Sequence, residues 1–147
     1  MSADNGIYIL KTRDQYRVAH LQAIENVYWS VIDGEWQGKC VPTRVVEMWG
    51  NCKFTRDANK ALDIAYRWAT KLPICEYGVK VITYNKTWKR ILEDAQEYAK
   101  QEISFIKNQH KEKLYEYEMN KLQNIADGYY LPKKKMNKGM FQFDFEF

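Results

Sequence analysis

The sequence predicts an α+β fold: a small mixed or antiparallel sheet with a packed helix, followed by a long C-terminal helix and a terminal strand-like tail. In the first half of the chain, segments with apolar period two alternate with segments at helical spacing. The second half carries one long helical pattern and then a short alternating run. We therefore expect an α+β core over residues 1–84, a helix over 85–128, and a basic linker with a Phe-rich terminal strand over 129–147.

The first two segments predict a β-hairpin. Residues 6–10 (GIYIL) suit a buried strand, and apolar and polar side chains alternate over residues 16–21. The polar residues 12–15 (TRDQ) form a connection of hairpin length.

The next stretch is less regular. Apolar residues recur at helical spacing from Ala23 to Val31, which predicts a helix that ends at Asp33 and Gly34. Residues 35–42 are interpreted as a loop. Residues 44–49 are ambiguous between a strand and a short helix, and we favour the strand because Gly50 and Asn51 suit a tight turn.

A helix and a strand complete the predicted core. Residues 56–72 carry a clear apolar stripe, with Thr55 as the expected cap and Pro73 as the stop. Residues 74–84 then alternate as a strand, in which Gly78 suggests a bulge.

The longest predicted element is a helix over residues 87–126, because apolar residues recur without an intervening Gly or Pro. At 1.5 Å per residue it would extend about 60 Å, so it must project, fold back or pack on another chain. The polar residues 108–113 (NQHKEK) are the expected place for a bend. An apolar stripe longer than one small domain can cover predicts a homo-oligomer.

The tail is the most specific feature. Four phenylalanines alternate with Gln142, Asp144 and Glu146, so one face of a strand would be apolar. Such a strand pairs either with its own sheet or with an edge on another chain. The candidate partner-binding residues are these four together with two helix tyrosines: Phe141, Phe143, Phe145, Phe147, Tyr115 and Tyr117.

Charge and aromatic content limit the classes of ligand that the protein could bind. The net charge of +4 comes from Lys133, Lys134, Lys135 and Lys138, since the other 19 basic residues balance the 19 acidic ones. A duplex binder usually spreads its basic residues over one face of the fold. Eleven Tyr and five Trp nevertheless leave open a nucleotide or single-stranded nucleic-acid ligand, stacked on rings and held by those lysines at its phosphates.

Enzymatic and metal sites have little support. The motifs for phosphate loops, dinucleotide binding and zinc proteases are absent from the sequence. Cys40, Cys52 and Cys75 are widely spaced, so we expect free thiols, no metal and no cofactor. A small enzyme remains a distant alternative, which convergence of His20, Glu25 and Asp33 in a pocket would favour. Without a basic leader or an 18-residue apolar run, we expect a cytoplasmic protein with no membrane partner.

Three segments carry a resemblance to known proteins. Residues 4–10 (DNGIYIL), 16–20 (YRVAH) and 76–79 (EYGV) resemble segments of small uncharacterised accessory proteins encoded by tailed bacteriophages. The resemblance covers residues 1–84. It implies a phage accessory protein made in the host bacterial cytoplasm, a group that often binds host proteins, including defence systems. The favoured function is therefore non-catalytic binding that modulates or inhibits a host protein.

Overall fold

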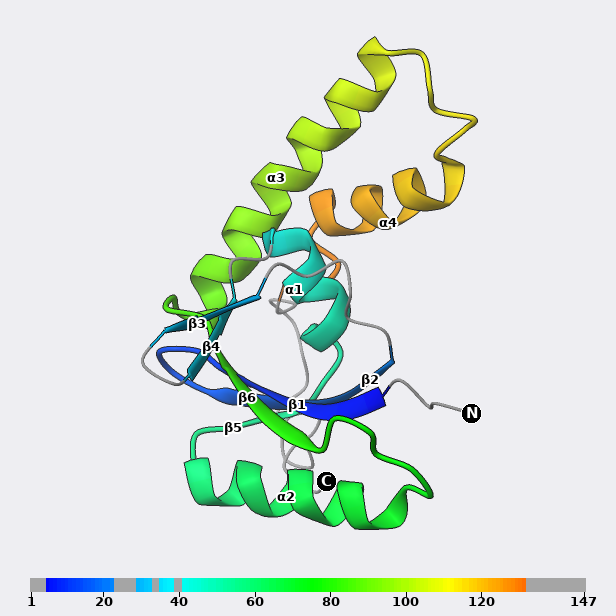
Figure 1. The fold of residues 1–147 in the computed structure, drawn as a ribbon. Helices are drawn as coiled ribbons and strands as arrows, with labels where there is room; N and C mark the ends of the chain where they lie inside the picture. Colours follow the sequence, from blue (N-terminus) through cyan, green and yellow to red (C-terminus); the bar gives the residue numbers. More distant parts are fainter. Residues whose placement is uncertain (1–4, 23–28, 33–34, 39–40, 132–147) are drawn as a thin grey trace, which may run out of the picture.

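A computed structural model describes residues 5–22, 29–32, 35–38 and 41–131 (Figure 1). The fold is α+β, as the sequence predicts. The strands are β1 (Asn5–Lys11), β2 (Tyr16–Gln22), β3 (Trp29–Ile32), β4 (Glu35–Gly38), β5 (Phe54–Thr55) and β6 (Val79–Thr83). The helices are α1 (Pro42–Trp49), α2 (Ala58–Lys71), α3 (Trp88–Asn108) and α4 (Glu116–Ala126).

The strands form one mixed sheet in the order β3-β4-β6-β1-β2-β5. The predicted hairpin is present: β1 and β2 are antiparallel, and the amide of Thr12 donates to the carbonyl of Gln15 at 2.9 Å to close the turn. The central strand β1 pairs in parallel with β6, and β6 in parallel with β4. The outer strands β3 and β5 are antiparallel to their neighbours.

Helices cover the two faces of the sheet unequally (Figure 1). Period two along β1 directs Ile7 and Ile9 to one face and Tyr8 and Leu10 to the other. Among the described helices, the first face packs against α2, and we call it the α2 face. The second packs against α1, α3 and α4, and we call it the three-helix face.

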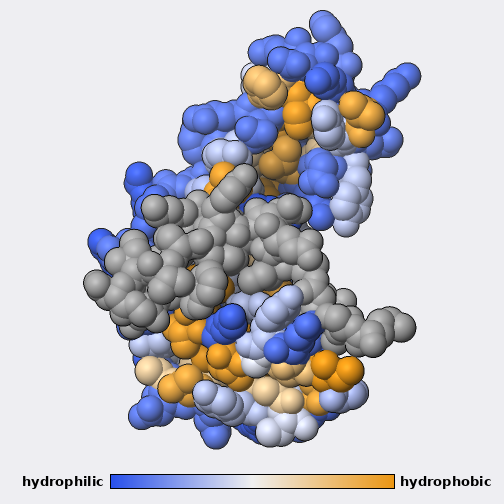
Figure 2. Space-filling model, viewed as in Figure 1, coloured by the Kyte–Doolittle hydropathy of each residue, from blue (hydrophilic) through white to orange (hydrophobic). Residues whose placement is uncertain are grey.

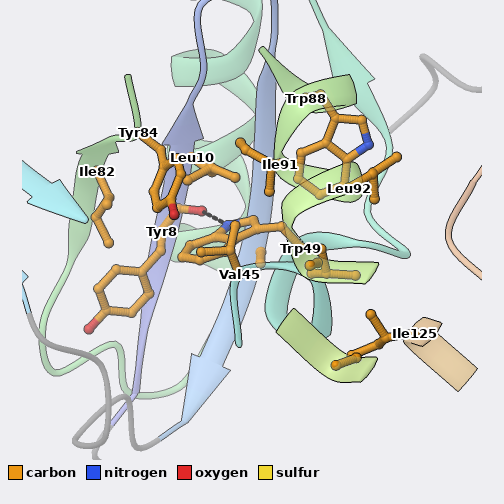
Figure 3. Close-up of a cluster of buried hydrophobic side chains, with 14 of the residues drawn as sticks. Tyr8, Leu10, Val45, Trp49, Ile82, Tyr84, Trp88, Ile91, Leu92 and Ile125 are labelled. Atoms are coloured by element: carbon orange, nitrogen blue, oxygen red, sulfur yellow. Dashed lines mark hydrogen bonds between the residues drawn. The ribbon is translucent and has the colours of Figure 1, made fainter. Parts of the chain in front are cut away.

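The segment 44–49 is helical, so the predicted strand there is wrong. Pro42 lies in the first turn, where its missing amide costs nothing. Val45, Val46 and Trp49 then fall on one side of α1 and are completely buried. The indole of Trp49 donates to the carbonyl of Tyr8 on β1 at 3.2 Å (Figure 3). Burial of this helical stripe outweighs the β propensity of the two valines.

Two further predictions are wrong. Residues 29–32, expected to end a helix, form β3, and residues 35–38, expected to be a loop, form β4. The start of that expected helix, residues 23–28, lies outside the described residues. In β4, Trp36 is the register partner of Ile82 in β6, far along the chain. Such a pairing leaves no local signal in the sequence.

The predicted helix over residues 56–72 is confirmed as α2, with a different cap. Asp57, and not Thr55, accepts hydrogen bonds from the amides of Asn59 at 2.9 Å and Lys60 at 3.4 Å. The hydroxyl of Thr55 accepts from the amide of Asp57 instead. The following strand, β6, is shorter than the predicted 74–84. Gly78 precedes it with a φ of +65°, so this glycine makes a turn into the strand and not a bulge within it.

The predicted long helix is broken at the expected polar stretch. His110 has a φ of +54°, a left-handed conformation that ends α3. The chain turns back over residues 109–115, and α4 returns to α3 (Figure 1). There the side-chain amide of Gln96 donates to the carbonyl of Ala126 at 2.9 Å. Because α4 itself covers part of the α3 stripe, a second chain is not needed for that purpose, and the homo-oligomer stays a prediction.

Candidate functional site

A groove with a volume of about 390 Å³ lies where α3 and α4 separate, above the start of α1. Two other described pockets measure only about 160 and 170 Å³. Hydrophobic side chains gather between α3 and α4, with hydrophilic ones around them (Figure 2). We call this site the α3–α4 groove. Its apolar and aromatic lining consists of Val41, Tyr98, Phe105, Ile106, Tyr115 and Leu122.

The break in the helical pattern creates the groove. Up to Ile103, α3 packs its stripe into the core, and Ile103 is buried. The helix then continues for another turn beyond the core. There Phe105 remains 60% exposed, since the turn at residues 109–115 carries the chain away before α4 returns. Tyr115, at the end of that turn, is 41% exposed. Two large rings thus remain accessible at one concave site.

The charges around the groove are unevenly paired. Arg44 and Glu47 of α1 form an ion pair at 3.0 Å. Glu102 of α3 and Glu118 of α4 also line the groove, and neither takes part in any of the ion pairs found within the described chain. Lys111 is the remaining charged residue of the lining. A ligand with apolar and basic side chains would therefore match this surface.

Only part of the predicted site can be placed. Tyr115 lines the groove, whereas Tyr117 is 69% exposed outside the lining, with the Lys121 ammonium 4.3 Å from its ring centroid. The other predicted residues lie outside the described part of the chain: Phe141, Phe143, Phe145, Phe147, Lys133, Lys134, Lys135 and Lys138.

The sequence analysis missed Phe105 and the two carboxylates. Phe105 does not belong to the apolar stripe formed by Ile103 and Ile106, so a search for helical periodicity passes over it. A large ring on the polar side of an amphipathic helix is itself a usable signal for a contact residue. Glu102 and Glu118 carried no signal, because their proximity depends on the fold-back of α4.

Arg17 is a second unusual residue, and its role is structural. Its side chain is buried beneath α1, where it donates to the carbonyls of Cys52 at 2.7 Å and Trp49 at 3.2 Å. The guanidinium carbon also lies 3.9 Å from the ring centroid of Trp88. Burial lowers the pKa of Arg17 to about 10, so the group is still charged at neutral pH. The carbonyls at the end of α1 and just after it are thereby held against β2.

The described thiols and imidazoles do not form a reactive centre. Burial raises the pKa of Cys52, although the nearby Arg17 charge acts in the opposite direction, so this thiol is protonated at neutral pH. Cys52 and Cys75 are free, while Cys40 lies outside the described residues. His20 is exposed on β2, and the Glu25 and Asp33 of the enzyme alternative are not among the described residues. Within the described ranges, no group of three or more His, Cys, Asp or Glu residues could hold a metal ion.

Comparisons with protein-family models, curated proteins and solved structures find no match for this chain. The resemblance to phage accessory proteins is therefore a prediction from the three quoted segments alone. Across the described helices, none is both long and apolar enough to cross a membrane.

Proposed function

We propose that this protein is a non-catalytic binding protein that takes a segment of another protein into the α3–α4 groove. The observation that carries the proposal is the exposure of Phe105 and Tyr115 beside two carboxylates that form no ion pair with any described residue, all lining one concavity. Aromatic residues that line a pocket are the usual anchors of protein interfaces. Burying one such ring contributes on the order of 1.5–3 kcal/mol.

The partner segment is an amphipathic helix with basic residues beside its apolar face. A helix-sized partner fits a groove whose two walls are themselves helices, α3 and α4. Lys or Arg on the partner would lie against Glu102 and Glu118. Such charge pairs fix the orientation of the bound segment more than they add to its affinity. The same carboxylates oppose the alternative of a nucleic-acid ligand at this site, because they repel phosphate.

The biological role we propose is modulation or inhibition of a bacterial host protein, such as a component of a defence system, in the host cytoplasm during phage infection. Its support is the resemblance of residues 4–10, 16–20 and 76–79 to segments of phage accessory proteins. The groove supports binding to another protein, and the resemblance supports a role in phage infection.

The test is selection of binders from a displayed library of random peptides, followed by affinity measurement on purified peptides. We expect enriched sequences to combine apolar and basic residues at helical spacing. Phe105→Ala should weaken their binding about 10–100-fold, the range of an interface anchor. The double variant E102Q/E118Q should weaken it less, and mainly at low salt.

Matched controls separate the groove from general surface effects. Tyr66→Ala removes a ring that is 59% exposed on α2, and Glu97→Gln removes an exposed carboxylate of α3 outside the groove. Neither should change peptide binding. If Tyr66→Ala weakens binding as much as Phe105→Ala does, the groove is not the binding site. Steep loss of peptide binding with added salt would show that charge pairing, and not the aromatic lining of the groove, carries the affinity.

A further inference from the structure

The turn between α3 and α4 is made without a glycine. Within the described chain, His110 is the one residue other than glycine that has a positive φ, at +54°. Its amide donates to the carbonyl of Lys107 at 3.0 Å, and the amide of Lys111 donates to the carbonyl of Ile106 at 3.2 Å. Glycine normally occupies the left-handed position of such a helix ending, because a side chain there is strained. The turn therefore forms against the conformational preference of its central residue.

The start of α4 lacks the usual cap. Asp57 and Thr87 cap α2 and α3 with side-chain oxygens, whereas the side chain of Tyr115, at the cap position of α4, makes no capping hydrogen bond. The amide of Tyr115 already donates to the carbonyl of Lys111 at 3.1 Å, four residues back, as in a helix. No glycine or proline interrupts residues 88–126. One continuous helix would give the first amides of α4 their helical partners.

The apolar stripe of α3 continues through the turn. Residues spaced by three or four positions share one side of a continuous helix. This spacing leads from the buried Ile103 to the buried Ile125 through Leu114 and Tyr117. In the folded-back chain, however, Leu114 is 73% exposed and Tyr117 is 69% exposed. A continuous helix would bring both side chains into line with the buried part of the stripe.

We propose that the chain forms a dimer by exchanging α4, with residues 88–126 of each copy as one helix. In the folded-back chain, α4 packs on its own α3 and adds Ile125 and Ala126 to the cluster of the three-helix face (Figure 1). In the dimer, the same side chains of α4 pack on the second copy. The surface that receives them is thus already shaped for this segment.

Two such helices run antiparallel about a two-fold axis near the turn, so Leu114 and Tyr117 of both copies meet there. The exchange keeps the contacts of α4, relieves the left-handed His110 and covers side chains that are exposed in the folded-back chain. The homo-oligomer expected from the sequence would take this form. The inference goes beyond the function proposed for the α3–α4 groove and does not depend on it.

Light scattering of the full chain over a concentration series tests the proposal. After equilibration at concentrations up to about 100 μM, monomer and dimer should coexist. His110→Gly should raise the dissociation constant of the dimer by about tenfold or more, because glycine favours the turn and weakens the helix at two hinges per dimer. His110→Ala should lower it, since alanine favours the helix. Glu97→Gly is the control, at an exposed position of α3 that is helical in both forms.

A second variant tests the stripe. L114S/Y117S should hardly change the stability of the monomer, because both side chains are exposed there. It should raise the dissociation constant of the dimer by about tenfold or more, since it removes apolar contacts at the two-fold axis. Tyr66→Ala, which removes an exposed ring of α2, is the matched control and should leave the dissociation constant unchanged.

Cross-linking of mixed unlabelled and ¹⁵N-labelled chains shows whether α4 is exchanged. In the proposed dimer, about half of the links between Lys121 of α4 and the lysines of α3 should join the two labels. Dimers whose α3–α4 links stay within one label would use another surface and would overturn the proposal. A chain that remains monomeric throughout the series, or equal dissociation constants for His110→Gly and Glu97→Gly, would overturn it as well.

Discussion

The two faces of the sheet are built differently. Among the residues whose burial is described, the three-helix face buries sixteen in one hydrophobic cluster, with contributions from three strands and three helices. On the same basis, the α2 face buries six, from two described strands and one helix. Helices that cross and extend past a sheet leave concave space between them, and the groove of about 390 Å³ lies there, whereas the pocket beside α2 measures only about 170 Å³. This difference explains why the candidate binding groove is found on the side with three helices.

The largest expected effect is at the centre of the three-helix face. Trp49→Ala should destabilise the protein by about 3–5 kcal/mol, because it removes a fully buried indole and leaves a cavity. It also removes the hydrogen bond to the Tyr8 carbonyl. Chemical denaturation measures the free energy of unfolding. The exposed ring of Tyr66 provides the comparison: Tyr66→Ala should cost only about 0.5 kcal/mol.

The corresponding change on the α2 face is Ile64→Ala. Ile64 is 1% exposed in a smaller cluster, so we expect a loss of about 2–3 kcal/mol. Because β1 contributes alternate side chains to both faces, the two clusters should unfold together. Tryptophan fluorescence and far-UV circular dichroism should therefore give coincident transitions for this variant. Separate transitions would mean that α2 unfolds as an independent layer.

Arg17 adds a polar case to the comparison of the two faces, since it is a buried charge on the three-helix face. Arg17→Met should cost about 2 kcal/mol, because the carbonyls of Trp49 and Cys52 lose their donor. Arg17→Lys should not restore the lost stability, as an ammonium cannot reproduce a planar fork that also stacks on Trp88. Thermal unfolding of both variants measures this. A fully stable lysine variant would show that charge alone matters.

The smallest expected effect is at the start of α2. Asp57→Ala removes the side chain that caps two amides and should cost about 1 kcal/mol. Asp63→Ala is the matched control, because Asp63 is exposed on the same helix. Its ion pair with Arg67 is long, at 4.0 Å, and therefore weak. The control variant should change stability by a few tenths of a kcal/mol. Equal effects in the two variants would argue against a capping role for Asp57.

Some elements could be predicted because their signals are local. The β1–β2 hairpin follows from period two on both sides of a short polar connection. The α2 helix follows from one apolar stripe that Pro73 ends, and the polar residues 108–113 indicate where α3 stops. By contrast, the turn signal of Gly50 and Asn51 favoured a strand over residues 44–49, although Pro42 and the spacing from Val45 to Trp49 also fit the helix that forms.

The sequence by itself determined the α+β class, the hairpin, α2 and the break in the last helical pattern, since each depends on neighbours within a few residues. Only the tertiary structure decided the strand order, the helical state of α1 and the groove. The parallel pairing of Ile7 with Val79, for example, joins distant segments, and its energy comes from burial that no local pattern records. Likewise, Phe105 and Glu118 line the same groove only because α4 folds back on α3, and that packing is decided between whole helices.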